Sequence, residues 1–281
     1  MIIDCHCHAW KGDGLTGPWD TAAPLGKYLR RAARAGIQRS VLFPAFHSDY
    51  LQANRAVAKI VASRPERFYG FAFIHPLNDR GRVSSLVREA VETHGFVGIK
   101  VHRHDGRITR EICEVAQRYS LPVLYDVMGE VSIVELLATE YPRVNFIIPH
   151  LGSFGDDWKA QRAFLDPLAR HPNIYTDTSG VRRYDLLEEA VQRAGAGKVL
   201  FGSDGPWLHP GVELFKVRML GLPPDQERLV LGANLLRLIA RVPLPGRHRP
   251  QLEGLPLSGS APVPQPVGVD HDPWLLETPL E

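Results

Sequence analysis

The chain has 281 residues, a formal net charge of +2 and an apolar fraction of 44%. Basic residues are spread along the chain, which argues against a nucleic-acid-binding surface, and no apolar run approaches the roughly 20 residues of a membrane span. The three cysteines lack the spacing of a disulfide scaffold, and the N-terminus lacks a signal-peptide pattern. We therefore expect a cytoplasmic protein with a small-molecule substrate and no nucleic-acid or membrane partner, compatible with a homo-oligomer.

The first expected element runs from Met1 to His8, a short apolar strand that ends in polar residues. Side chains alternate along a strand, so Asp4, His6 and His8 should share one face. Two imidazoles two residues apart on one face can bind a single metal ion, and imidazole is a common zinc ligand. The pattern predicts a metal site, and its plain alternative is two unrelated histidines.

Seven further β-rich runs alternate with helical ones along the chain. We expect strands at 37–43, 68–74, 96–101, 121–125, 144–148, 173–176 and 198–201. Helices are expected at 24–35, 50–63, 83–94, 109–119, 132–140, 157–169 and 185–194, with one or two more within 211–240. Ser132 and Glu135 have the spacing of a capping box.

Eight such β-α units predict an α/β protein, a (β/α)8 TIM barrel over residues 1–241. A dinucleotide-binding fold lacks support because no Gly-x-Gly-x-x-Gly follows the first strand. From residue 242 onward proline, glycine and serine dominate and periodicity disappears. Residues 242–281 are therefore expected to form an extended or disordered C-terminal tail.

Polar residues recur where the predicted strands end. In a barrel all these C-terminal strand ends meet at one mouth, where barrel enzymes hold their active sites. Residues far apart in the sequence should thus line one cup: His6, His8, Lys100, His102, Asp126, His150 and Asp204.

These residues lie in segments that resemble the amidohydrolase superfamily, and within it the amidohydrolase-2 family of metal-dependent TIM-barrel hydrolases and decarboxylases. The resemblance covers about residues 1 to 240 and leaves the tail unmatched. Its segments are Asp4-Cys5-His6-Cys7-His8, Ser63-Arg64-Pro65-Glu66-Arg67-Phe68, Gly98-Ile99-Lys100-Val101-His102, Leu121-Pro122-Val123-Leu124, Pro149-His150-Leu151-Gly152, Leu200-Phe201-Gly202-Ser203-Asp204-Gly205-Pro206 and Leu231-Gly232-Ala233-Asn234.

The resemblance implies one divalent metal ion at the barrel mouth, with zinc favoured and manganese or iron as alternatives. His6, His8 and Asp204 take the places of family ligands. Where the family usually has a further histidine, this chain has Asp126. A carboxylate can also bind a divalent ion and would favour a harder one such as manganese. We therefore expect Asp126 as the fourth ligand; alternatively it has lost that role, and His150 replaces it or the site is empty.

The resemblance also implies catalytic roles. A bound metal lowers the pKa of its water to about 7 in favourable cases. Asp204 would hold that water, and His150 would polarise the substrate carbonyl or stabilise an oxyanion. Substrate binding is expected from Lys100, His102, Arg103 and Trp207. Lys100 could instead pair with a neighbouring acid or, when carboxylated, bridge two metals.

Three functions follow from this site. The first is a hydrolase that cleaves an amide, lactone or ester of a small carboxylate-bearing substrate, which the lack of long insertions favours. The second is a non-oxidative decarboxylase of a small aromatic or cyclic acid. The third is an inactive ligand-binding barrel. The one observation in its favour is that Asp126 stands where the family usually has a histidine. A metal-dependent deoxyribonuclease is set aside because the chain has Gly-Ile-Lys at residues 98–100 and Gly-Ser-Asp at residues 202–204.

Overall fold

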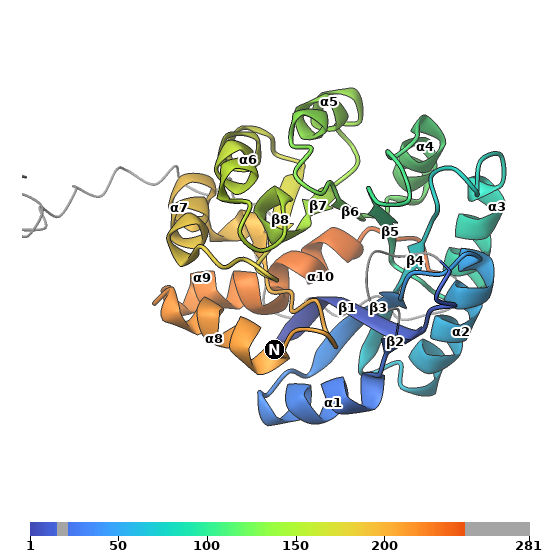
Figure 1. Cartoon of the computed structure of the whole chain (residues 1–281), viewed down its shortest axis with the longest axis horizontal. Helices are drawn as coiled ribbons and strands as arrows, with labels where there is room; N and C mark the ends of the chain where they lie inside the picture. Colours follow the sequence, from blue (N-terminus) through green and yellow to red (C-terminus); the bar gives the residue numbers. More distant parts are fainter. Residues whose placement is uncertain (16–21, 245–281) are drawn as a thin grey trace, which may run out of the picture.

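A curled sheet with helices around it forms the protein (Figure 1). The computed structural model describes residues 1–15 and 22–244, so the predicted tail from residue 245 lies outside the described residues. The nine strands lie in the order β2-β1-β3-β4-β5-β6-β7-β8-β9, and every neighbouring pair is parallel except β1 and β2. Their bounds are β1 (Ile3–Lys11), β2 (Ala22–Ala23), β3 (Arg39–Pro44), β4 (Phe68–Phe73), β5 (Gly98–His102), β6 (Val123–Asp126), β7 (Phe146–Ile148), β8 (Ile174–Asp177) and β9 (Val199–Leu200).

The sheet closes where β1 meets the segment that follows β9. The Cys5 amide donates to the Phe201 carbonyl at 3.0 Å, and the His8 amide donates to the Gly205 carbonyl at 2.6 Å. Cys7 and Gly205 also form a parallel bridge. The predicted TIM barrel is confirmed, and this closure brings the first strand and the Gly-Ser-Asp segment side by side.

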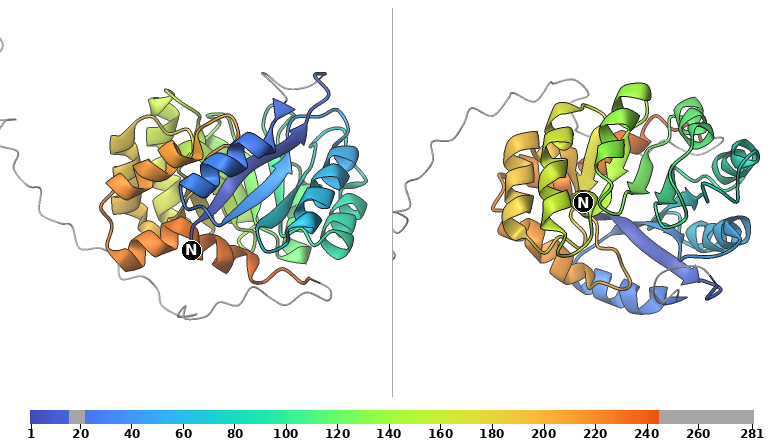
Figure 2. Two further views of the ribbon diagram at one scale, coloured as in Figure 1. Left: turned by 90° about the horizontal axis from the view of Figure 1, so that it is seen from below. Right: turned by 45° about the horizontal axis from the view of Figure 1, so that its top comes forward.

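The helices follow the strands and cover the outside of the barrel (Figure 2). Their bounds are α1 (Leu25–Arg34), α2 (Tyr50–Ser63), α3 (Val83–Arg88), α4 (Arg110–Tyr119), α5 (Ser132–Glu140), α6 (Trp158–Arg170), α7 (Tyr184–Ala194), α8 (Pro210–Met219), α9 (Pro224–Arg228) and α10 (Asn234–Ile239). The predicted capping box is wrong: α5 begins after Val131 with no side-chain cap, and Ser132 is already its first residue. No helix in the described part of the chain is long and apolar enough to cross a membrane.

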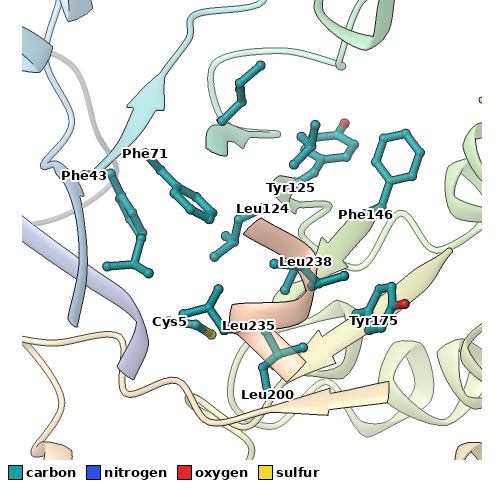
Figure 3. Close-up of a cluster of buried hydrophobic side chains, with 14 of the residues drawn as sticks. Cys5, Phe43, Phe71, Leu124, Tyr125, Phe146, Tyr175, Leu200, Leu235 and Leu238 are labelled. Carbon is teal, nitrogen blue, oxygen red and sulfur yellow. The ribbon is translucent and has the colours of Figure 1, made fainter. Parts of the chain in front are cut away.

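The interior of the barrel is filled by apolar side chains, and α10 closes one end. Figure 3 shows Leu235 and Leu238 of α10 beside Cys5, Leu124 and Leu200 from the strands. All five side chains are buried. Just before α10, a Cβ at Gly232 would lie 3.1 Å from the Met1 carbonyl oxygen, so this segment covers the N-terminal ends of the strands. The polar residues of the predicted site lie at the opposite, C-terminal ends of the strands.

The Phe71 ring occupies the space that a side chain at Gly98 on β5 would fill. A Cβ there would lie 2.4 Å from Cε1 of the buried Phe71 ring. We expect Gly98→Ala to lower the free energy of unfolding by about 1–3 kcal/mol, because the core must shift to accept a methyl group. Chemical denaturation measures this. Gly26→Ala is the control, since its Cβ would meet nothing nearer than 3.9 Å within α1; equal stability of the two variants would contradict the prediction.

Candidate active site

His6 and His8 lie on β1, and each ring is oriented by a hydrogen bond at Nδ1. His6 Nδ1 lies 2.8 Å from Asp177 Oδ2, and His8 Nδ1 lies 2.9 Å from the Pro44 carbonyl oxygen. Both partners are acceptors, so we place the proton of each ring on Nδ1, and each Nε2 keeps a free lone pair. Burial lowers the pKa of His6 to about 4 and that of His8 well below its usual range. Both rings are thus neutral at neutral pH, as metal ligands must be.

Asp204, in the loop after β9, faces both lone pairs. Its Oδ1 lies 3.4 Å from His6 Nε2 and 3.5 Å from His8 Nε2. Two ligand atoms on one tetrahedral zinc, with bonds near 2.0–2.1 Å, lie about 3.3 Å apart. Ligand atoms of these three residues all lie within 4.8 Å of one another. Acceptors that face one another in this way fit a divalent cation held between them. Burial raises the pKa of Asp204 to about 7, so a proton would compete with that cation.

Asp126 ends β6 and lies between two imidazoles. Its Oδ2 is 3.2 Å from His102 Nε2 and 3.5 Å from His150 Nε2. His102 Nδ1 accepts a hydrogen bond from the His104 amide, so its Nε2 carries the proton and donates to Asp126. Among residues 1–15 and 22–244, the compact group of ligand atoms contains His6, His8 and Asp204 without Asp126. Ligation by Asp126 stays a prediction.

His150, which follows β7, differs from the other two histidines in its charge. Its Nδ1 lies 2.7 Å from the Ser179 carbonyl oxygen, which can only accept. Burial disfavours the charged ring, but the Asp126 carboxylate outweighs it and raises the pKa of His150 to about 9. In the metal-free protein this raised pKa favours protons on both ring nitrogens at neutral pH. The ring centroids of His150 and His6 are 5.2 Å apart, so a proton donor adjoins the candidate metal centre.

Lys100 on β5 is completely buried, and its Nζ has no hydrogen-bond partner. The ammonium lies 5.2 Å from the centre of the Phe43 ring. Burial lowers the pKa of Lys100, although the carboxylates of Asp126 and Asp204 act in the opposite direction. Of the buried polar side-chain atoms without a hydrogen-bond partner in the described residues, this Nζ is the one that belongs to an ionisable amine. A buried ammonium in this state fits an anionic ligand.

A family model described as amidohydrolase matches residues 3–240. The chain belongs to the amidohydrolase family. It is 25% identical to γ-resorcylate decarboxylase of Rhizobium sp. (strain MTP-10005), over 56% of this chain and 65% of that protein. The chain thus matches slightly less than two thirds of the length of this curated relative.

Solved structures similar to this amidohydrolase include enzymes of two classes. A dihydroxybenzoic acid decarboxylase from Polaromonas sp. JS666, with bound manganese and the inhibitor 2-nitroresorcinol, has a TM-score of 0.66 and 18% identity over 85% of this chain and 96% of that one. A probable 2-pyrone-4,6-dicarboxylic acid hydrolase from Acinetobacter baumannii, with bound citric acid, has a TM-score of 0.66 and 16% identity over 85% and 98%. At these identities the likeness shows the shared fold.

Two other residues predicted to bind substrate in this amidohydrolase already have protein partners. Arg103 Nε donates to Glu130 Oε2 at 2.6 Å, so its guanidinium forms an ion pair. Trp207 Nε1 donates to the Ala22 carbonyl at 2.9 Å, and the Trp207 ring lies 4.4 Å from the His8 ring. Trp207 therefore borders the candidate metal centre, whereas the Arg103 guanidinium is paired with Glu130.

Asp4 has a role that the sequence did not reveal. Its Oδ1 accepts from the amides of His6 and Ser203, and its Oδ2 accepts from the Tyr28 and Ser203 hydroxyls. With four donors the carboxylate has little capacity left for a metal. It instead joins the first strand of the amidohydrolase to the residue before Asp204, which fixes the spacing of the three candidate ligands.

Two residues of the site have an uncommon backbone conformation. His150 has a φ of 59° and Asp204 a φ of 53°, in the left-handed region that non-glycine residues seldom adopt. Such a conformation costs about 1–2 kcal/mol per residue. Strain of this kind gathers at functional sites, where the surrounding structure holds it. Both proposed catalytic residues thus carry it.

Proposed function

We propose that this member of the amidohydrolase family is a metal-dependent, non-oxidative decarboxylase of a small aromatic carboxylic acid. The observation that carries the proposal is the contact of His150 Nε2 with Asp126 Oδ2 at 3.5 Å, which raises the pKa of His150, together with the buried Lys100 Nζ that has no hydrogen-bond partner. In a decarboxylation the carboxylate leaves as CO2, the bonding electron pair stays on the ring carbon, and that carbon takes up a proton. The reaction therefore needs an anion-binding group and a proton donor, and we assign these roles to Lys100 and His150.

His6, His8 and Asp204 are the residues that would hold the metal ion, with zinc favoured and manganese or iron as alternatives. When bound, a divalent ion acts there as a Lewis acid on an oxygen of the substrate. His150 supplies its Nε2 proton to the ring carbon, and the contacts of Asp126 with both His150 and His102 keep that proton in place. Lys100 binds an anionic oxygen of the acid. Asp126 remains our predicted fourth ligand, although its contacts also suit this positioning role.

Aromatic side chains around these groups support an aromatic substrate. The Phe154 ring stands edge-on to His150 at 5.1 Å between centroids, and it is half exposed. The Phe46 ring is edge-on to His102 at 4.9 Å, and Trp207 lies beside His8. The exposed part of the Phe154 ring is a surface on which an aromatic ligand can pack in the edge-to-face or offset geometry that aromatic pairs prefer. The similarity to two aromatic-acid decarboxylases supports the same class.

Hydrolysis is the second candidate, because the fold is also similar to that of a probable 2-pyrone-4,6-dicarboxylic acid hydrolase. Both reactions can be followed in one experiment with dihydroxybenzoates and cyclic esters in water enriched in oxygen-18. Decarboxylation releases CO2 and leaves no oxygen from water in the ring product, whereas hydrolysis places one such oxygen in the product acid. Oxygen-18 in the product without release of CO2 would refute the decarboxylase. No turnover of either class by the metal-loaded protein would favour an inactive ligand-binding barrel.

Removal of the metal is expected to abolish activity and to lower the melting temperature. A ligand present at 1,000 times its Kd stabilises the folded state by about 4 kcal/mol, which a chelator would withdraw. Elemental analysis, activity and melting temperature should be measured before and after dialysis against a chelator, and again after zinc or manganese is returned. The metal centre would be ruled out by less than about one-tenth of an equivalent as purified, with no uptake on incubation.

A further inference from the structure

Asp177 at the end of β8 is a completely buried carboxylate that contacts the candidate ligand His6. Its two oxygens have separate partners. Oδ2 lies 2.8 Å from His6 Nδ1. Oδ1 accepts from the Ser179 amide at 3.0 Å, from the Ser179 hydroxyl at 2.6 Å and from the His150 amide at 3.3 Å. The carboxylate therefore cannot rotate without breaking hydrogen bonds to two backbone amides.

Gly202 provides the space in which this carboxylate lies. A Cβ at Gly202 would be 3.0 Å from Asp177 Cγ and 3.1 Å from Asp177 Oδ2. A side chain there would push Asp177 away from His6. The first glycine of the Gly-Ser-Asp segment thus serves the carboxylate behind His6, as well as the loop that carries Asp204.

Of the histidines His6, His8 and His150, His6 is the one whose nearest Nδ1 partner is a side chain, the Asp177 carboxylate at 2.8 Å. The Ser179 hydroxyl lies farther from His6 Nδ1, at 3.4 Å. His8 Nδ1 faces the Pro44 carbonyl, and His150 Nδ1 faces the Ser179 carbonyl. A backbone carbonyl accepts whatever the side chain of its residue. We propose that Asp177 is a positioning residue that keeps the proton of His6 on Nδ1, so that Nε2 stays free to bind the metal.

The substitution Asp177→Asn reverses the donor and acceptor at His6. The amide oxygen must take the place of Oδ1, because two backbone amides donate there. The NH2 group then replaces Oδ2 and points at His6 Nδ1, where it can only donate. His6 must present a lone pair at Nδ1 and move its proton to Nε2. The metal-binding lone pair is lost, although the side chain keeps nearly the same shape.

The tautomer can be measured directly in the metal-free protein by nitrogen-15 NMR of labelled histidine. In the wild type we expect the His6 proton on Nδ1, and in Asp177→Asn on Nε2. Isothermal titration with zinc should then show an affinity about 10- to 100-fold lower in the variant. Asp177→Ala offers a second variant: it removes the carboxylate acceptor, adds no donor and leaves the more distant Ser179 hydroxyl near Nδ1, so both tautomers should be populated.

The control is Asp79→Asn, the same change at another buried aspartate, which accepts from the His75 amide and pairs with Arg82. It should leave the His6 tautomer and zinc affinity as in the wild type. A His6 proton that stays on Nδ1 in Asp177→Asn overturns the proposal. The zinc titration rests on the proposed function. If the tautomer changes but the zinc affinity does not, Asp177 does set the tautomer of His6, and His6 is not a metal ligand.

Discussion

Replacement of Asp204 by asparagine is expected to abolish turnover while the protein stays folded. The variant keeps the shape of the side chain but loses the anionic oxygen that lies 3.4 and 3.5 Å from the two Nε2 atoms. Loss of an outer contact of a metal site costs about 10–100-fold in affinity, so loss of a ligand should cost more than about 100-fold. Zinc titration and steady-state kinetics on the metal-loaded protein measure both effects.

Asp166→Asn provides the matched control, since Asp166 forms an exposed ion pair with Arg193 on the outside of the barrel. It makes the same change of charge, and an exposed pair contributes only about 0–1 kcal/mol to stability. Its activity and metal content should equal those of the wild type. Normal turnover by Asp204→Asn would remove Asp204 from the reaction, and normal metal content would remove it from the metal centre.

Comparison of the wild type with Asp204→Asn also makes the pKa of Asp204 measurable, through its effect on the free energy of unfolding. Burial raises this pKa from 3.8 to about 7 in the metal-free protein, so the folded state holds the proton more tightly than the unfolded state. The unfolding free energy of the wild type should therefore fall, relative to that of Asp204→Asn, as pH rises from about 4 to 7, by up to about 1.4 kcal/mol per pKa unit. Urea denaturation with a chelator present, at pH 5 and pH 8, tests this. If the difference in unfolding free energy between the wild type and Asp204→Asn is the same at pH 5 and pH 8, the pKa of Asp204 is not raised.

The barrel could be predicted from sequence because its pattern is local. Each buried strand of β-branched and aromatic residues stands between helices with apolar faces, and the strands were placed within two or three residues of their observed bounds. A closed barrel was expected, but the residues that pair where it closes, Cys7 and Gly205, could not be predicted from any local pattern because they lie about two hundred positions apart. The short antiparallel β2 was also missed, since two alanines carry no strand pattern.

The candidate site was only partly predictable for a related reason. The rule that polar residues follow strands found His6, His8 and Asp204, which the fold does bring together. The same rule applies to Asp177, which directly follows the strand expected at 173–176, but Asp177 was not among the predicted site residues. No sequence rule could show that the Asp4 carboxylate is used up by four donors. Hydrogen-bond partners depend on side-chain directions that only the folded chain fixes.

Substitution of Lys100 by methionine is expected to stabilise the protein and to weaken its function. Because burial lowers the pKa of Lys100, the folded state disfavours its charge, and methionine keeps the aliphatic stem beside Phe43 without that charge. Removal of a buried group that lacks a hydrogen-bond partner should raise the unfolding free energy by about 1–3 kcal/mol. In a domain of this size each kcal/mol raises the melting temperature by about 2–4 °C.

The functional effect of Lys100→Met should have the opposite sign. A hydrogen bond to a charged group contributes about 1.5–3 kcal/mol, so kcat/KM for an anionic substrate should fall about 10- to 100-fold. Lys216→Met is the comparison: its Nζ binds Glu213 and the Thr178 and Val181 carbonyls, so the same substitution there should destabilise the fold. Higher stability with lower kcat/KM identifies Lys100 as a group kept for an anion. If both values fall together, the ammonium supports the structure, and the anionic substrate must be bound by another residue.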